Sequence, residues 1–99
     1  MVNILNFASW QIELQETATI YYLKVHDSLE VFELTVTVSP KDIMVEGFLF
    51  TIGYYHRFID SKIWTHNLPN GQSTRNTGDF NTQTILHEID RWLEKNGIN

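Results

Sequence analysis

The sequence predicts an α+β fold, an antiparallel and curled five-stranded β-meander with one C-terminal amphipathic helix packed on a face. Three observations predict it. Residues 9–67 alternate between apolar and polar side chains with the period of β-strands. Residues 82–96 follow helical spacing. The connections between the predicted strands are short, as antiparallel neighbours allow. With 99 residues, the chain is expected to form a single domain, 1–99.

Three strands are predicted in the first part of the chain. Residues 10–16 alternate cleanly, which indicates a half-buried strand. Residues 19–25 are rich in β-branched and aromatic side chains and are apolar on both faces, which suits a central strand. Residues 32–38 show the clearest alternation, and the turn residues 39–42, which include a proline, end this strand.

A fourth strand is predicted over residues 43–55 and a fifth over residues 62–66. Gly47 and Gly53 lie inside the fourth strand, where glycine often marks a bulge or a bend, and this favours a curled sheet. The polar stretch 67–80 follows. It is interpreted either as a mobile connector or as a recognition loop, since long ordered loops tend to be functional.

The C-terminal helix carries one apolar stripe, formed by Ile85, Leu86, Ile89, Trp92 and Leu93. We expect Asn81 to cap its start, with Phe80 as the hydrophobic staple. Gly97 suits the left-handed position after the last turn, and Ile98 is expected to reach back to Leu93.

Polar side chains cover the rest of the helix, and Glu88 and Arg91 are spaced to form an ion pair. We interpret this outer face as solvated and without a site. It comprises His87, Glu88, Asp90, Arg91, Glu94 and Lys95.

One helix is narrower than a five-stranded sheet and covers about half of one face. Residues 19–25 and 43–55 are nevertheless apolar on both faces. Three explanations remain open: the sheet curls and buries its concave side, the chain forms a homodimer, or an apolar patch is left for another protein.

The net charge of −5 lies entirely in the first half of the chain. Residues 1–50 carry seven acids and two bases, whereas residues 51–99 carry five of each. Direct binding of nucleic acid is therefore disfavoured, and a basic protein is the natural electrostatic partner.

No catalytic, cofactor or metal signature is present. The chain lacks cysteine, a nucleophile elbow and nucleotide-binding glycine loops. A turn at Asp60 and Ser61 would set His56 opposite Thr65 and His66 opposite Tyr55, so the two histidines face opposite sides of the sheet and cannot chelate together. We expect no enzyme activity, no cofactor and no metal.

The order of elements, a β-meander followed by a C-terminal helix that contains Trp92, is similar in outline to pleckstrin-homology domains. The similarity covers only that helix and the general order. The first hairpin lacks the basic cluster with which that family binds phosphoinositides, and five strands are predicted where the family has seven. The resemblance therefore does not imply lipid binding.

These observations lead to a functional expectation: a non-enzymatic inhibitor or antagonist that binds a basic protein partner, such as a nuclease or a toxin. A phage anti-defence protein such as an anti-CRISPR and a toxin immunity protein are both of this kind. The expected partner-binding residues are acidic and aromatic, with two from the polar stretch: Asp27, Glu30, Glu33, Glu46, Tyr21, Tyr22, Tyr54, Tyr55, Trp64, Asn70 and Arg75.

Two alternatives remain open. One is a homo-oligomeric structural or accessory module of phage or bacterial origin. The other is a small-ligand binder inside a curled sheet, lined by Phe48, Phe50, Tyr54 and Trp64. No segment has the length of a membrane helix or the features of a signal peptide, and the lack of cysteine fits a reducing compartment, so we expect a cytoplasmic location.

Overall fold

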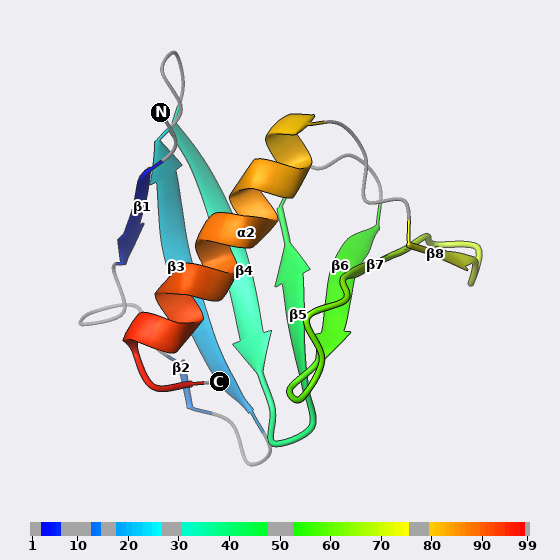
Figure 1. The fold of residues 1–99 in the computed structure, drawn as a ribbon, viewed down its shortest axis with the longest axis horizontal. Helices are drawn as coiled ribbons and strands as arrows, with labels where there is room; N and C mark the ends of the chain where they lie inside the picture. The colour runs from blue at the N-terminus through cyan, green and yellow to red at the C-terminus, as the bar shows by residue number, and fades with distance from the viewer. Residues whose placement is uncertain are drawn as a thin grey trace.

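The computed structural model describes residues 3–6, 13–14, 18–26, 31–47, 53–75 and 80–98. It consists of an antiparallel sheet and one C-terminal helix, α2 (Phe80–Lys95), which confirms the α+β class (Figure 1). Six of the described strands have three or more residues: β1 (Asn3–Asn6), β3 (Thr19–His26), β4 (Val31–Val38), β5 (Asp42–Glu46), β6 (Tyr54–Phe58) and β7 (Thr65–Asn67). Two strands have only two residues, β2 (Glu13–Leu14) and β8 (Ser73–Thr74).

The strands follow one another across the sheet in the order β1-β3-β4-β5-β6-β7-β8, and β2 also pairs with β3. β1 pairs with the end of β3 and β2 with its start. The strand predicted over residues 10–16 is thus confirmed only at Glu13–Leu14, and its other residues lie outside the described ones. β1 was not predicted because its sequence, Asn-Ile-Leu-Asn, does not alternate.

The hairpin of β3 and β4 forms the centre of the sheet and confirms the second and third predicted strands. Its register sets Leu23 opposite Leu34 and Thr19 opposite Val38. β5 continues the meander, with Val45 opposite Val36. Six inward side chains of these strands are fully buried, because α2 packs on this face of the sheet: Leu23, Val25, Leu34, Val36, Ile43 and Val45.

The prediction of one strand over residues 43–55 is wrong. β5 and β6 are separate antiparallel strands, with Val45 opposite Tyr55 and Ile43 opposite Arg57. Gly53, just before β6, has a φ of +96°, and a Cβ there would collide with the backbone oxygen of Asn67. A glycine thus marks the return of the chain into β6 and not a bend within one strand. Residues 48–52 of the predicted strand lie outside the described ones.

The fifth strand is shorter than predicted but has the predicted register. β7 sets His66 opposite Tyr55 and Thr65 opposite His56. A hairpin then leads into β8, with Gly71 at a φ of +89°, so the first part of the stretch 67–80 forms a short antiparallel pair. Residues 76–79 lie outside the described ones.

The helix confirms its predicted apolar stripe, because Ile85, Leu86, Ile89, Trp92 and Leu93 are all buried. Its start differs from the prediction: the helix begins at Phe80, so Asn81 lies within the first turn and is not the N-cap.

The end of the helix is as predicted. Gly97 has a φ of +69°, and the backbone N–H groups of Ile98 and Gly97 donate to the carbonyl oxygens of Leu93 and Glu94 at 3.0 and 3.1 Å. This is the hydrogen-bond pattern of a Schellman motif. The predicted ion pair on the outer face is also present, with 3.3 Å between Arg91 and Glu88.

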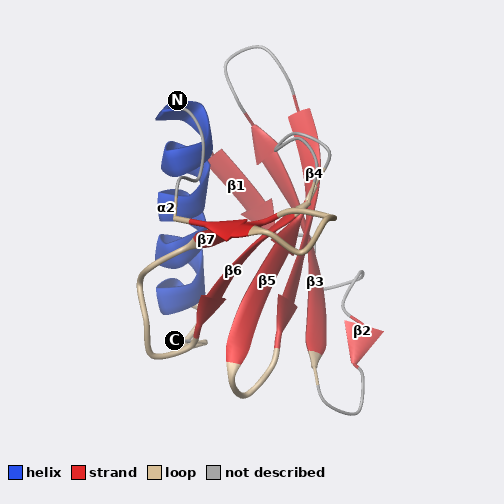
Figure 2. Cartoon of the chain, turned by 90° about the vertical axis from the view of Figure 1, so that its right-hand side faces the viewer, coloured by secondary structure: helices blue, strands red, loops and turns tan. Residues whose placement is uncertain are grey.

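Figure 2 shows α2 against one face of the sheet, and no described element packs on the opposite face. An antiparallel sheet tolerates this arrangement because one of its faces can meet water. Curling of the sheet stays a prediction.

A buried arginine joins the helix to the sheet. The Arg57 side chain is 0% exposed, and its Nε donates to Oδ1 of Asp90 at 2.9 Å. Its Nη1 donates to the carbonyl oxygens of Phe58 and Ser61 at 3.2 and 2.8 Å, which fixes the turn after β6. Trp64 Nε1 donates to the other Asp90 oxygen at 3.1 Å, and the guanidinium carbon lies 5.2 Å from the centre of the Trp64 ring. Asp90 was predicted to lie on the solvated face of the helix. This prediction is wrong, because both of its carboxylate oxygens accept hydrogen bonds on the inner side of α2, one from Arg57 and one from Trp64.

Removing the carboxylate should destabilise the fold strongly. We expect Asp90→Ala to lower the free energy of unfolding by about 3–5 kcal/mol, because it leaves a buried guanidinium without its counter-charge. The double variant Arg57→Met/Asp90→Leu should recover much of that loss, since no buried charge remains. Urea denaturation measures both. The control is Glu94→Ala, which breaks only the exposed pair with Lys62 and should cost less than about 1 kcal/mol. A similarly small cost for Asp90→Ala would contradict the proposed role of this carboxylate.

Candidate functional site

The candidate site is the face of the sheet opposite α2, which we call the open face. Strand alternation and register place two rows of side chains on it. In one row Tyr22 lies opposite Thr35, which lies opposite Glu46. The register of β5 with β6, carried one residue further, sets Glu46 opposite Tyr54. The second row is Ile20, Thr37, Met44, His56 and Thr65.

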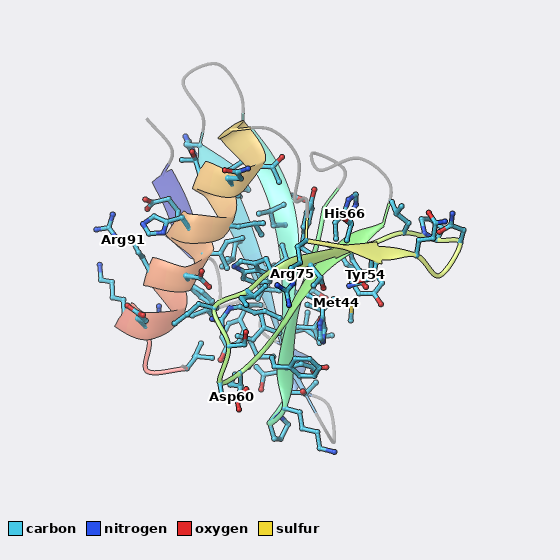
Figure 3. The ribbon with its side chains drawn as sticks, turned by 45° about the vertical axis from the view of Figure 1, so that its right-hand side comes forward. Met44, Tyr54, Asp60, His66, Arg75 and Arg91 are labelled. Carbon is cyan, nitrogen blue, oxygen red and sulfur yellow. The ribbon has the colours of Figure 1, made fainter. Side chains whose placement is uncertain are left out.

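Four of the predicted partner-binding residues meet on the open face: Tyr22, Glu33, Glu46 and Tyr54. Glu33 and Glu46 are exposed, and they are diagonal neighbours because Glu46 pairs with Thr35. Diagonal neighbours lie about 7–8 Å apart. Tyr54 is 36% exposed, and Figure 3 shows it with Met44 on the side of the sheet away from α2. The open face therefore combines carboxylates with a tyrosine.

Three of the predicted aromatic residues lie on the other face. Tyr55 and Trp64 are buried in the core, at 2% and 8% exposure, so neither belongs to an exposed surface. Tyr21 is half-buried and meets Trp92 edge to face, with 5.2 Å between ring centres. The assignment of these three residues to one binding surface with Tyr22 and Tyr54 is therefore corrected: adjacent residues of a strand point to opposite faces.

The remaining predicted residues are separate from this group. Asp27 and Glu30 lie outside the described residues. Asn70 is exposed at the tip of the β7–β8 hairpin, where its Oδ1 accepts a hydrogen bond from the backbone N–H of Gln72 at 3.0 Å. Arg75 follows β8 and lines a hollow beside α2, on the helix side of the sheet.

Sequence reasoning missed two further features of the open face. Phe58 is 58% exposed, and its ring meets His56 edge to face at 5.0 Å. His56 Nε2 in turn lies 3.0 Å from Oδ2 of Asp42. The signal for Phe58 was its place four residues after Tyr54, which puts both on the same face of one strand. It was overlooked because the fourth strand was predicted to end at residue 55.

The Asp42 carboxylate is held by hydrogen bonds at the β4–β5 turn. Ser39 Oγ donates to its Oδ1 and also accepts the backbone N–H of Asp42 at 3.0 Å. The Ser39 hydrogen bond, followed by the His56 contact, lowers the pKa of Asp42 below its ordinary value of 3.8, against a smaller opposing effect of burial.

The order of contacts in this cluster differs from that of a catalytic triad. A catalytic serine donates to a histidine, which a carboxylate then orients. Here the carboxylate lies between the two, so Ser39 donates to Asp42 and not to His56. The cluster therefore stabilises the turn and presents a negative charge beside Phe58.

Two other features, a metal site and a membrane-spanning helix, are not found in the part of the chain that the structure describes. No group of three or more histidine or acidic side chains there could hold a metal ion. His66 stacks on Tyr55, with 4.6 Å between ring centres, whereas His56 faces Asp42, so these two histidines diverge as predicted. No helix among the described residues is long and apolar enough to cross a membrane.

Comparison with known proteins identifies no relative of this chain. The chain matches no protein-family model. Searches of curated proteins and of solved structures find no match either. No comparison supports the similarity in outline to pleckstrin-homology domains.

The lowered pKa of Asp42 predicts a pH-dependent contribution to stability. A carboxyl group with a lower pKa in the folded state stabilises the fold above its unfolded pKa and loses that effect as the pH falls through the folded pKa. At pH 7 we expect Asp42→Asn to cost roughly 0.5–1 kcal/mol, a modest value because the group is partly exposed. The difference from wild type should shrink below about pH 4. Urea titrations at several pH values measure it, and a difference that stays constant down to pH about 2.5 would contradict the assignment.

Proposed function

We propose that this chain is a non-enzymatic protein-binding inhibitor or antagonist that uses the open face against a basic protein partner. One observation carries the proposal: Glu46 and Tyr54, both exposed, are neighbours on a sheet face that no described element covers. The sequence-based expectation is thus narrowed from a mixed list of residues to one surface.

The charge of the open face supports a basic partner. On β3, β4 and β5 it carries three acids, Glu33, Asp42 and Glu46, and one base, Lys24, a balance of −2 with histidines neutral. Lys24 lies opposite Glu33, so Glu46 is the acid with the least compensation from a cross-strand base. Such a face accelerates the approach of a positively charged protein and disfavours nucleic acid.

The aromatic side chains supply the apolar part of the interface. Tyr54 and Phe58 are 36% and 58% exposed and lie on the same side of β6. Tyrosine is frequent among interface residues that dominate binding energy, because it buries a large apolar area and keeps a hydroxyl for hydrogen bonding. Ile20 in β3 and Met44 in β5 add two half-buried apolar side chains to this face, with Thr37 of β4 between them.

Inhibition would follow because the positive charge of such a partner lies in its nucleic-acid-binding site. Nucleases and many toxins that act on nucleic acid bind phosphates through Lys and Arg side chains. A protein whose carboxylates occupy those side chains would exclude the substrate without any chemistry of its own. A phage anti-defence protein, such as an anti-CRISPR, and a toxin immunity protein would both work in this way.

The two alternative functions have less support. A homodimer through the open face would bring Glu33, Asp42 and Glu46 close to their own copies, and like charges oppose association. A ligand cavity lined by both Tyr54 and Trp64 is not formed, because Tyr54 lies on the open face and Trp64 contacts Asp90 of the helix. Phe48 and Phe50, the other predicted lining residues, lie outside the described ones.

Charge reversal on the open face should abolish capture of the partner. The tagged chain is used to capture proteins from cells of its source, and the variant Glu33→Lys/Glu46→Lys is compared with Asp60→Lys/Glu94→Lys. Both double variants change the net charge equally, but Asp60 and Glu94 lie on a turn and on the helix. A basic protein that the first variant loses and the second retains is expected.

The rate of association then tests the mechanism on the purified pair. We expect the association rate constant to fall by about tenfold or more for the open-face variant, and to fall for wild type when salt rises from about 50 to about 300 mM. The proposal is wrong if both double variants bind alike, or if the captured protein leaves its own activity unchanged when saturated.

A separate variant tests the aromatic contribution. Tyr54→Ala should weaken affinity by about tenfold or more through faster dissociation, because it removes a central apolar contact without changing charge. Surface plasmon resonance measures both rate constants. The matched control is Ile63→Ala, which truncates an exposed apolar side chain away from the open face. An unchanged dissociation rate in Tyr54→Ala would remove Tyr54 from the interface.

A further inference from the structure

A hollow of about 340 Å³ lies on the helix side of the molecule, between the segment before β7, the end of β8 and the outer edge of α2. Trp64, Leu86 and Asp90 are its buried and half-buried residues. Its exposed lining consists of Lys62, Ile63, Arg75, Gln83 and His87. The volume is at the lower end of the range for small-molecule sites.

The charges of this hollow leave one cation uncompensated. Both oxygens of Asp90 accept hydrogen bonds, Oδ1 from Arg57 and Oδ2 from Trp64, so the Arg57 guanidinium compensates the negative charge of this carboxylate. Lys62 is paired with Glu94 at 3.2 Å, but both side chains are more than half exposed and the pair is weak. No described residue forms an ion pair or a hydrogen bond with Arg75, which Figure 3 shows on the side of α2 that faces the sheet.

The lining also includes three apolar residues. Ile63 is 52% exposed, whereas Trp64 and Leu86 lie at the base of the hollow with 8% and 2% exposure, so Ile63 offers most of the apolar surface. Apolar walls combined with a few polar groups that fix orientation are typical of ligand sites. A guanidinium binds planar carboxylates and phosphates through two parallel hydrogen bonds.

We infer that this hollow binds a small molecule that carries one anionic oxygen group, a carboxylate or a phosphate, on a flat apolar body. Arg75 binds the anionic group, and Ile63, with Trp64 at the base of the hollow, contacts the apolar body. Lys62 exchanges its exposed partner Glu94 for the ligand. This site lies on the opposite side of the sheet from the open face, so it is independent of the proposed protein interface.

The test uses the indole N–H signal of Trp64 in the ¹⁵N-labelled full chain, assigned with Trp64→Phe. Four probes are titrated: benzoate, phenyl phosphate, the neutral benzamide, and inorganic phosphate. Benzoate and phenyl phosphate should shift this signal saturably, with dissociation constants in the millimolar range expected for fragments. Benzamide and inorganic phosphate should each bind at least about tenfold more weakly, since each lacks one half of the recognised ligand.

Two arginine variants separate the site from general charge effects. Arg75→Gln should weaken benzoate or phenyl phosphate about tenfold or more. Arg91→Gln, which removes an exposed arginine from the other side of α2 (Figure 3), should leave both affinities unchanged. A thermal melt verifies that both variants fold. The inference fails if no aromatic anion gives a saturable shift, if benzamide binds as well as benzoate, or if Arg75→Gln binds like wild type.

Discussion

The contact of Arg57 with Asp90 ties the helix to β6 and to the turn that follows it. Between β6 and β7 the backbone has no ladder, and it is held by hydrogen bonds from the Arg57 guanidinium to Phe58 and Ser61. The same guanidinium holds Asp90, which holds Trp64. The cluster works together with the apolar stripe of α2, which packs on the same side of the sheet. The opposite side is the open face. The hollow lies beside the cluster, since Trp64 and Asp90 both line it.

Local signals in the sequence were enough for much of the fold. The apolar stripe of the helix, its Schellman ending and the register of β6 with β7 each depend on residues close together in the chain, and each is confirmed. Alternation identified β4, and the β-branched and aromatic composition of residues 19–25 identified β3, because both strands are eight residues long and carry these signals clearly. The signal failed where strands are short: β1 and β8 contain four and two residues, too few for any period to show.

Other errors have a physical cause in long-range contacts. Residues 43–55 were predicted as one strand because both arms of the β5–β6 hairpin alternate, and only the φ of Gly53 reveals the return of the chain. Asp90 was assigned to solvent because helical periodicity cannot show that a strand residue 33 positions away supplies a buried cation. The predicted set of partner-binding residues combined residues from both faces of the sheet, and this error could be avoided from the sequence. Tyr21 and Tyr22 are adjacent on a strand, as are Tyr54 and Tyr55, so the members of each pair cannot share one face.

The apolar excess that first suggested a binding function is divided between the two faces. Ile43, Val45 and Tyr55 point to the helix, whereas Met44 and Tyr54 lie on the open face. The open face thus combines apolar side chains with carboxylates, which favours the proposed basic partner over a second copy of the chain. β6 serves both sides: Tyr54 and Phe58 face the open surface, and Arg57 between them faces the helix.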